Sequence, residues 1–153
     1  MKINTIKENI NERKENNLVE GKELQRWKRR IIFFRFIYSV LVMDLNKEQI
    51  HEKLQYELPE FKDDELNKII EFFADNKSKI ETKVESLLKE NWTLDRLNKV
   101  DLALIISAFC EYTVTGINRK IIIDQAIITS KKYSEKSSYK FINFILDKLL
   151  PKE

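Results

Sequence analysis

The sequence predicts an all-α fold, and three observations support this prediction. The chain of 153 residues contains only two glycines and two prolines, at Gly21, Gly116, Pro59 and Pro151. Sheets need tight turns, which glycine, proline and Asn-Gly pairs supply, and the sequence has almost none of these. The apolar residues recur instead at the i, i+3, i+4, i+7 spacing of a helix with one buried face. We therefore expect six to eight helices.

Three stretches of the sequence show the helical spacing most clearly. The first runs from Phe34 to Leu45, the second continues in register from Leu66 to Leu88, and the third runs from Phe141 to Leu149. An apolar stripe along one side of a helix is buried against neighbouring helices. These three stretches are therefore predicted to be helices that contribute to the core.

Polar residues and glycine mark the ends of the predicted helices. Asn46 and Gln49 have the spacing of a capping box, in which each side chain satisfies a backbone amide of the other residue. Acidic residues favour the start of a helix because the helix dipole is positive there. The other predicted boundaries are Asp63–Glu65, Thr93, Gly116, Ser137 or Ser138, and Pro151. A first bundle of helices is expected to give way to a second near Asn91.

Composition indicates a single domain with a core of its own. Hydrophobic residues make up 42% of the chain and charged residues 35%, which excludes a disordered polar chain. The longest apolar run, Ile31–Val42, is interrupted by Arg35 and is too short to cross a bilayer. Met1–Asn17 is polar and charged, without the apolar region of a secretory signal. We therefore expect a cytoplasmic protein with no membrane association.

Basic residues are concentrated toward the amino-terminal end. The net charge is only +3, yet residues 22–35 contain six basic residues and one acidic residue. Arginine suits bidentate contact with phosphate, and the interleaved Trp27 and Tyr38 suit stacking on bases. This pattern favours binding to nucleic acid. The alternative is that these charges only solvate the start of a helix.

The sequence contains no recognisable catalytic or metal-binding arrangement. The single histidine, His51, lies in a predicted surface helix without a cysteine or carboxylate partner in a motif. The single cysteine, Cys110, excludes an intramolecular disulfide and a multi-cysteine metal site, and it is predicted to be a buried apolar residue. No glycine-rich loop is present to hold a nucleotide. The sequence therefore predicts a protein that is not an enzyme and that needs no cofactor or metal.

Two segments of the chain have an unusual order of residues. Asn91–Asp101 reads NWTLDRLNKVD, and Tyr139–Lys148 reads YKFINFILDK. At this spacing the pair resembles the NusB family of transcription antitermination factors, and the resemblance extends from about Gln25 to Lys148. We accordingly treat residues 1–22 as a variable amino-terminal extension and residues 23–153 as a NusB-like RNA-binding domain.

The resemblance implies a fold of two three-helix bundles packed at an angle. It also implies binding to boxA RNA together with the ribosomal protein NusE, in a complex that helps RNA polymerase to read through terminators. Matched by position, the expected RNA-binding residues are Arg26, Lys28, Arg29, Arg30, Tyr38, Lys140, Phe141 and Asn143. Asp101 matches an acidic position associated with the protein partner. Monomers and homodimers both occur in such proteins, and the sequence leaves this choice open.

Two residues and two alternative functions affect how this resemblance is interpreted. Phe144 stands where the family usually has glycine, so a larger side chain has to fit there. Phe141 is as well explained as a core aromatic residue as by RNA contact. One alternative function is the RNA-binding domain of a ribosomal RNA cytosine methyltransferase, which would need a following cofactor-binding domain. The other is a helical adaptor that binds proteins without binding RNA.

Overall fold

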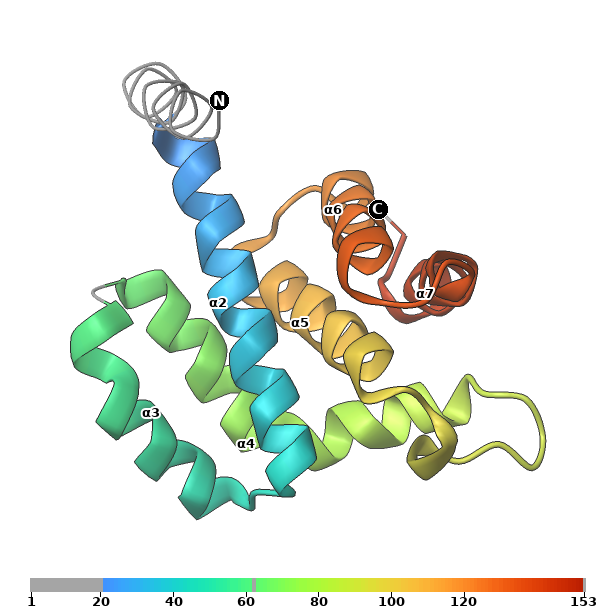
Figure 1. Ribbon diagram of the computed structural model, residues 1–153, viewed down its shortest axis with the longest axis horizontal. Helices are drawn as coiled ribbons and strands as arrows, with labels where there is room; N and C mark the ends of the chain where they lie inside the picture. The colour runs from blue at the N-terminus through green and yellow to red at the C-terminus, as the bar shows by residue number, and fades with distance from the viewer. Residues whose placement is uncertain (1–20, 62, 153) are drawn as a thin grey trace, which may run out of the picture. The chain divides into compact units, whose positions relative to one another are not determined.

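The elements of secondary structure are all helical in the part of the chain that the structure describes. The computed structural model describes the backbone of residues 21–61 and 63–152 and the side chains of 26–57 and 63–152. Its elements, in chain order, are α2 (Gly21–Met43), α3 (Lys47–Phe61), α4 (Asp64–Ser86), the 3₁₀ helix η1 (Leu94–Arg96), α5 (Lys99–Thr115), α6 (Arg119–Tyr133) and α7 (Ser138–Leu149) (Figure 1). Six α-helices agree with the predicted fold class. The predicted amino-terminal extension, residues 1–22, lies almost entirely outside the described residues.

Contacts between residues divide the chain into two compact units. The first ends at Ile32 and the second begins at Phe33, and α2 runs from one unit into the other. None of the helices in residues 21–61 and 63–152 combines the length and the apolar character needed to cross a membrane. The core described below belongs to the second unit.

The second part of α2 packs with α3 and α4 as a first group of helices. The rings of Phe33 on α2 and Phe73 on α4 meet edge to face, with centroids 6.3 Å apart and planes at 79°. The ammonium of Lys53 on α3 lies 5.1 Å from the centre of the Phe36 ring on α2. Edge-to-face rings and cation–π contacts add specific geometry to the burial of apolar surface. Most of the apolar residues predicted on α2 and α4 therefore face a common core, whereas Tyr38 and Val42 on α2 are exposed.

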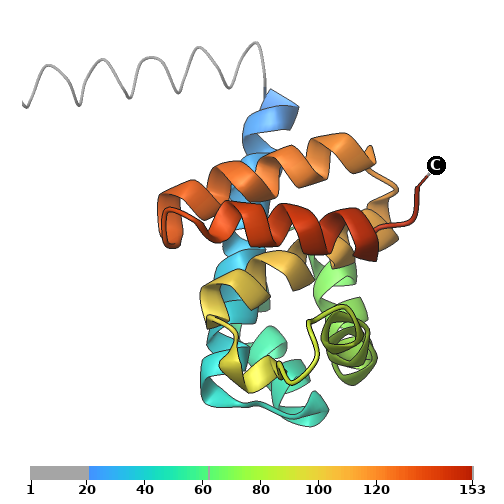
Figure 2. The same ribbon diagram turned by 90° about the vertical axis from the view of Figure 1, so that its right-hand side faces the viewer.

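The second group consists of α5, α6 and α7, each of which packs against the other two. Figure 2 shows α6 and α7 running side by side, with α5 packed against them. The helix α5 also packs against α4, so it joins the two groups. The chain passes from one group to the other through a loop that contains Asn91 at φ 72°, a left-handed conformation that asparagine tolerates. The predicted change of bundle near Asn91 is confirmed.

Most of the predicted helix ends are confirmed. Asn46 and Gln49 form the capping box, with both backbone-to-side-chain hydrogen bonds at 2.9 Å. The Asp63 carboxylate accepts a hydrogen bond of 3.0 Å from the backbone N–H of Leu66 at the start of α4. Gly116 ends α5 in the left-handed conformation at φ 69°. At each of these helix ends, a nearby residue therefore provides hydrogen bonds for backbone groups that lack a partner within the helix.

Two further helix starts were predicted from the sequence, and one of them differs in its capping residue. Thr93 precedes the short helix η1 and its side chain makes no capping hydrogen bond. The long helix α5 is capped instead by Asn98, whose side chain accepts from the N–H of Val100 at 2.7 Å. Ser137 precedes α7 without a side-chain cap, because its backbone is already helical at φ −94° and ψ −8°. The predicted start of the last helix at Ser137 or Ser138 is thus confirmed, whereas the long helix after Asn91 is capped by Asn98 and not by Thr93.

Arg119 ties the start of α6 to the end of α7. Its Nη2 donates to the backbone oxygen of Asp147 at 2.6 Å and to the carboxylate of Asp147 at 2.7 Å. Its Nε donates to the backbone oxygen of Leu150 at 3.2 Å. The last carbonyls of a helix lack partners within the helix, so one guanidinium satisfies two of them. The hydrogen bond from Arg119 also lowers the pKa of the Asp147 carboxyl below its ordinary value.

Replacing Arg119 with glutamine should raise the pKa of Asp147 toward its ordinary value. Because the pKa of Asp147 is lower in the folded protein, the interaction stabilises the fold at pH values above the unfolded-state pKa. That stability is lost as the pH falls through the folded-state pKa. Carbon-detected NMR titration of the Asp147 carboxyl in both proteins measures the change. An identical pKa in the two proteins would show that the ion pair does not form in solution.

Candidate nucleic-acid interface

The predicted basic residues of the first unit lie on the amino-terminal half of α2. Arg26 and Lys28 are exposed, and Arg29 and Arg30 are partly buried. Residues three and four apart share a side of a helix, so Arg26, Arg29 and Arg30 project from the same side. Lys28 is two residues from Arg26 and projects from the opposite side. The basic segment therefore presents three arginines on one side of α2 and a lysine on the other.

The remaining predicted RNA-binding residues belong to the second unit. Tyr38 is exposed on α2, with 39% of its surface accessible. Lys140 and Asn143 on α7 are exposed, and Phe141, which follows Lys140 in the sequence, is partly buried. Phe141 packs against the hydrophobic core and also lines a surface pocket. Phe141 therefore contributes to the core and also presents part of its ring to the pocket.

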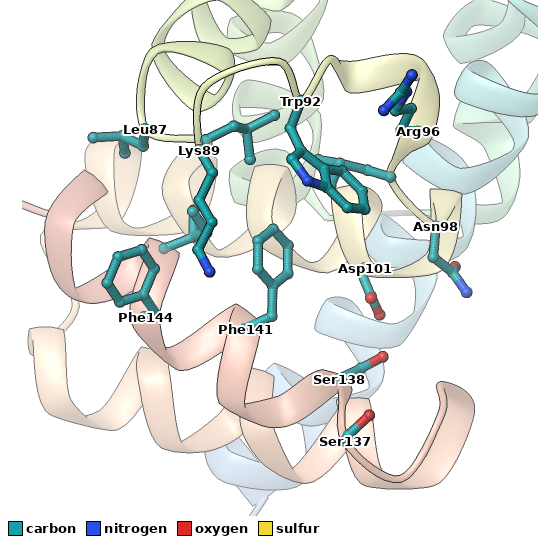
Figure 3. Close-up of a pocket in the computed structure, with 13 residues that line it drawn as sticks. Leu87, Lys89, Trp92, Arg96, Asn98, Asp101, Ser137, Ser138, Phe141 and Phe144 are labelled. Carbon is teal, nitrogen blue, oxygen red and sulfur yellow. The ribbon is translucent and has the colours of Figure 1, made fainter.

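A pocket of about 420 Å³ lies beside α7 in the second unit. It is formed by the segment after α4, by η1, by the start of α5 and by the first half of α7 (Figure 3). Its aromatic residues are Trp92, Phe141 and Phe144, and its polar and charged residues are Lys89, Arg96, Asn98, Asp101, Ser137 and Ser138. Leu87, Leu88, Leu97 and Ile145 complete the lining. A mostly apolar cavity with a few polar groups is typical of a binding site.

Asp101 is held at the edge of this pocket by the loop between α6 and α7. Only 7% of Asp101 is exposed, and its carboxylate accepts a hydrogen bond from the hydroxyl of Ser134 at the end of α6. The same hydroxyl lies 3.1 Å from that of Ser138, the first residue of α7. A buried carboxylate needs such partners because burial removes its water. Asp101 therefore fixes the start of α5 to the start of α7.

The structure brings some of the predicted site residues together at the pocket. Asp101 and Phe141 line the same pocket, although the sequence comparison assigned them to different partners. The arginines of α2 belong to the first unit, and Tyr38 does not line the pocket. Among the pocket residues that the sequence analysis did not place in a site are Lys89, Trp92 and Phe144. The sequence signal for them was an aromatic residue within one helical turn of a lysine: Trp92 follows Lys89 by three positions, and Phe144 lies four positions from both Lys140 and Lys148. The structure adds that Trp92 and Phe144 are 48% and 50% exposed.

His51 forms a surface hydrogen bond with a carboxylate. Its Nε2 lies 3.1 Å from the carboxylate of Asp75, which also lies 3.5 Å from the ammonium of Lys47. The hydrogen bond with His51 is the main reason that the pKa of Asp75 is lowered. Among the side chains described, no group of three or more potential ligands could hold a metal ion. Cys110 is completely buried, as predicted, and burial raises the pKa of its thiol.

Comparison with known proteins shows the family. The model of the NusB family matches residues 27–151, and the chain belongs to this family. It is 33% identical over 111 residues to the transcription antitermination protein NusB of Ligilactobacillus salivarius, covering 70% of this chain and 82% of that protein. It is also 33% identical over 130 residues to the protein of the same name from Borreliella burgdorferi, covering 79% of this chain and 90% of that one.

Solved structures agree with this assignment. T. maritima NusB matches with a TM-score of 0.67 and 27% identity, covering 81% of this chain and 89% of that chain. A Mycoplasma genitalium protein, described as structurally homologous to NusB proteins, matches with a TM-score of 0.61 over 75% of this chain and 91% of its own. At 22% identity, the second match shows a shared fold. The predicted NusB-like all-α fold is confirmed.

Replacing Ser134 with alanine should destabilise the protein by about 1–3 kcal/mol, because the buried carboxylate of Asp101 then loses a hydrogen-bond donor. Urea unfolding followed by circular dichroism measures the free energy of unfolding. Ser107→Ala is a matched control, since the Ser107 hydroxyl donates only within its own helix, to the Leu104 carbonyl at 3.0 Å. Equal, small effects of the two substitutions would show that water replaces Ser134 at no cost.

Proposed function

We propose that this chain is a transcription antitermination factor that acts by binding RNA and protein and that catalyses no reaction. The observation that supports this most directly is the match of the NusB family model to residues 27–151. Relatives with the name transcription antitermination protein cover most of the chain. In the more specific form of the proposal, the chain binds boxA RNA together with the ribosomal protein NusE in the cytoplasm. The assembly then helps RNA polymerase to pass terminators.

Phosphate contact is assigned to the basic segment of α2. Arg26 and Lys28 are exposed, and the guanidinium groups of Arg29 and Arg30 follow on the same helix. Arginine contacts phosphate through two parallel hydrogen bonds and keeps its charge at any physiological pH. Such contacts position the RNA strand but do not read its sequence.

Contact with bases is assigned to the second unit. Tyr38 exposes an aromatic ring on which an unpaired base can stack. The exposed amide of Asn143 offers both a donor and an acceptor for the edge of a base. Lys140, exposed one turn earlier on α7, and Phe141, at the pocket, complete this set. Sequence preference would come from these residues, because they reach bases and not only phosphates.

Contact with the protein partner is assigned to the surface around Asp101. Since only 7% of Asp101 is exposed, its contribution is to hold the start of α5 and the start of α7 in place for the partner. This assignment applies equally to a monomer and to a homodimer. It also predicts that disrupting Asp101 affects partner binding through local structure and not through a lost surface charge.

Replacing both Arg29 and Arg30 with alanine should weaken binding to boxA RNA and reduce its dependence on salt. Each lost phosphate contact should lower the slope of log affinity against log salt by about 0.7 for single-stranded RNA. Titration of labelled RNA at several salt concentrations measures the slope. The double variant Lys68→Ala/Lys79→Ala removes the same charge from exposed positions of α4 and should leave the slope nearly unchanged.

The same titrations distinguish the adaptor alternative. Adding NusE should strengthen binding to boxA RNA more than binding to a scrambled RNA, because the partner supplies part of the binding surface. If the wild-type protein binds NusE but neither RNA, with or without the partner, then the chain is an adaptor without affinity for RNA. Unchanged affinity in the Arg29→Ala/Arg30→Ala protein would show that the arginines only solvate α2.

Replacing Tyr38 with alanine should weaken binding to boxA RNA by about 1–3 kcal/mol, which is the typical contribution of one base stacked on an aromatic ring. The salt slope should stay the same, because the ring carries no charge. Tyr38→Phe retains the ring and should bind nearly as well as the wild type. Circular dichroism confirms that each variant is folded. A loss in Tyr38→Phe equal to that in Tyr38→Ala would assign the effect to the hydroxyl.

A further inference from the structure

Two aromatic side chains at the pocket beside α7 are half exposed. Phe144 on α7 and Trp92 before η1 have 50% and 48% of their surfaces accessible, and both line the pocket. Figure 3 shows Trp92 and Phe141 directed toward one another across the pocket, with Phe144 further along α7. Single exposed hydrophobic residues are common on protein surfaces, whereas here two half-exposed aromatic rings line one cavity. The pocket therefore offers accessible ring faces to a ligand.

Lysines lie near Phe144 and at the pocket. Lys140, Phe144 and Lys148 are four residues apart, so they lie along one side of α7. The Lys148 ammonium is 5.0 Å from the centre of the Phe144 ring. Lys89 lines the pocket from the segment after α4, and in Figure 3 its side chain extends toward α7. Alternating cations and aromatic rings are the pattern of a site for single-stranded nucleic acid.

Two acidic side chains of these helices are engaged by polar partners. The Asp101 carboxylate is mostly buried and accepts from Ser134, and the Asp147 carboxylate accepts from Arg119 at 2.7 Å. These partners reduce the negative potential that the pocket presents to a ligand. The exposed charge around Phe144 is therefore predominantly positive, which suits the phosphates next to an inserted base.

We propose that this pocket receives one unstacked base of the bound RNA, with Trp92 and Phe144 providing the stacking surfaces and Lys89 and Lys148 the phosphate contacts. The inference rests on the proposed RNA-binding function. A volume of about 420 Å³ is within the range of ligand pockets and accommodates one base. A base matches the site better than an apolar side chain of a protein partner, because the phosphates on either side of the base use the lysines.

A thermodynamic cycle between protein and RNA tests the contact. The probes are boxA RNA and a series of boxA RNAs in which a single base is missing at successive positions. With wild-type protein, loss of the bound base should weaken binding about tenfold. With Phe144→Ala, intact RNA should bind about tenfold more weakly, and loss of that same base should have little further effect. Phe144→Tyr keeps the stacking surface and should restore the dependence on that base.

A control and a spectroscopic readout complete the test. Ile121, on α6, is also 50% exposed and does not line the pocket, so Ile121→Ala should bind every RNA as the wild type does. In a Trp27→Phe protein, Trp92 is the single remaining tryptophan. Intact RNA should quench its fluorescence, and RNA without the coupled base should not.

The outcomes separate this inference from the proposed function. If intact boxA RNA binds through Arg29 and Arg30 but no base position couples to Phe144, the base pocket is wrong and the RNA-binding function stands. If Phe144→Ala weakens binding to NusE and leaves every RNA titration unchanged, the pocket holds a side chain of the protein partner. If the wild-type protein binds no boxA RNA, with NusE present or absent, both proposals are overturned.

Discussion

The burial of α5 is the constraint on which the rest of the second unit depends. Residues Leu102 to Ile106 and Ala108 to Cys110 are all buried, so apolar residues occupy every side of this helix. A helix that is apolar all round has to be enclosed by other helices. The helices α4, α6 and α7 all pack against α5. Its enclosure therefore sets where α7 and the loop after α4 must lie, and with them the walls of the pocket.

Polar contacts at the two ends of α7 fix its position against this core. At the start of α7, the Ser134 hydroxyl connects the carboxylate of Asp101 with the hydroxyl of Ser138. At the other end, Arg119 binds the last carbonyls and the side chain of Asp147. Hydrogen bonds contribute direction as well as stability, whereas apolar packing has little directional preference. The exposed side of α7, with its alternating lysines and aromatic ring, is thereby held in a defined orientation.

The two surfaces proposed to bind RNA differ in the kind of contact that each would make. The basic segment of α2 supplies arginines, which contribute affinity that depends on salt and not on sequence. The surface of α7 supplies aromatic rings and an amide, whose contacts with bases do not depend on charge. Under this proposal, affinity and sequence preference come from different residues of a protein whose net charge is only +3.

The sequence by itself determined the fold class, most helix boundaries and the family, because helical periodicity, capping residues and motif order are local properties. It also identified the basic segment of α2. Only the tertiary structure decided that Asp101 is turned toward Ser134 and that Trp92, Phe141 and Phe144 share one pocket. Trp92 and Phe144 are 52 positions apart, and their proximity depends on how α4, α5 and α7 pack. Packing between distant segments is a collective result of burial, which no local pattern encodes.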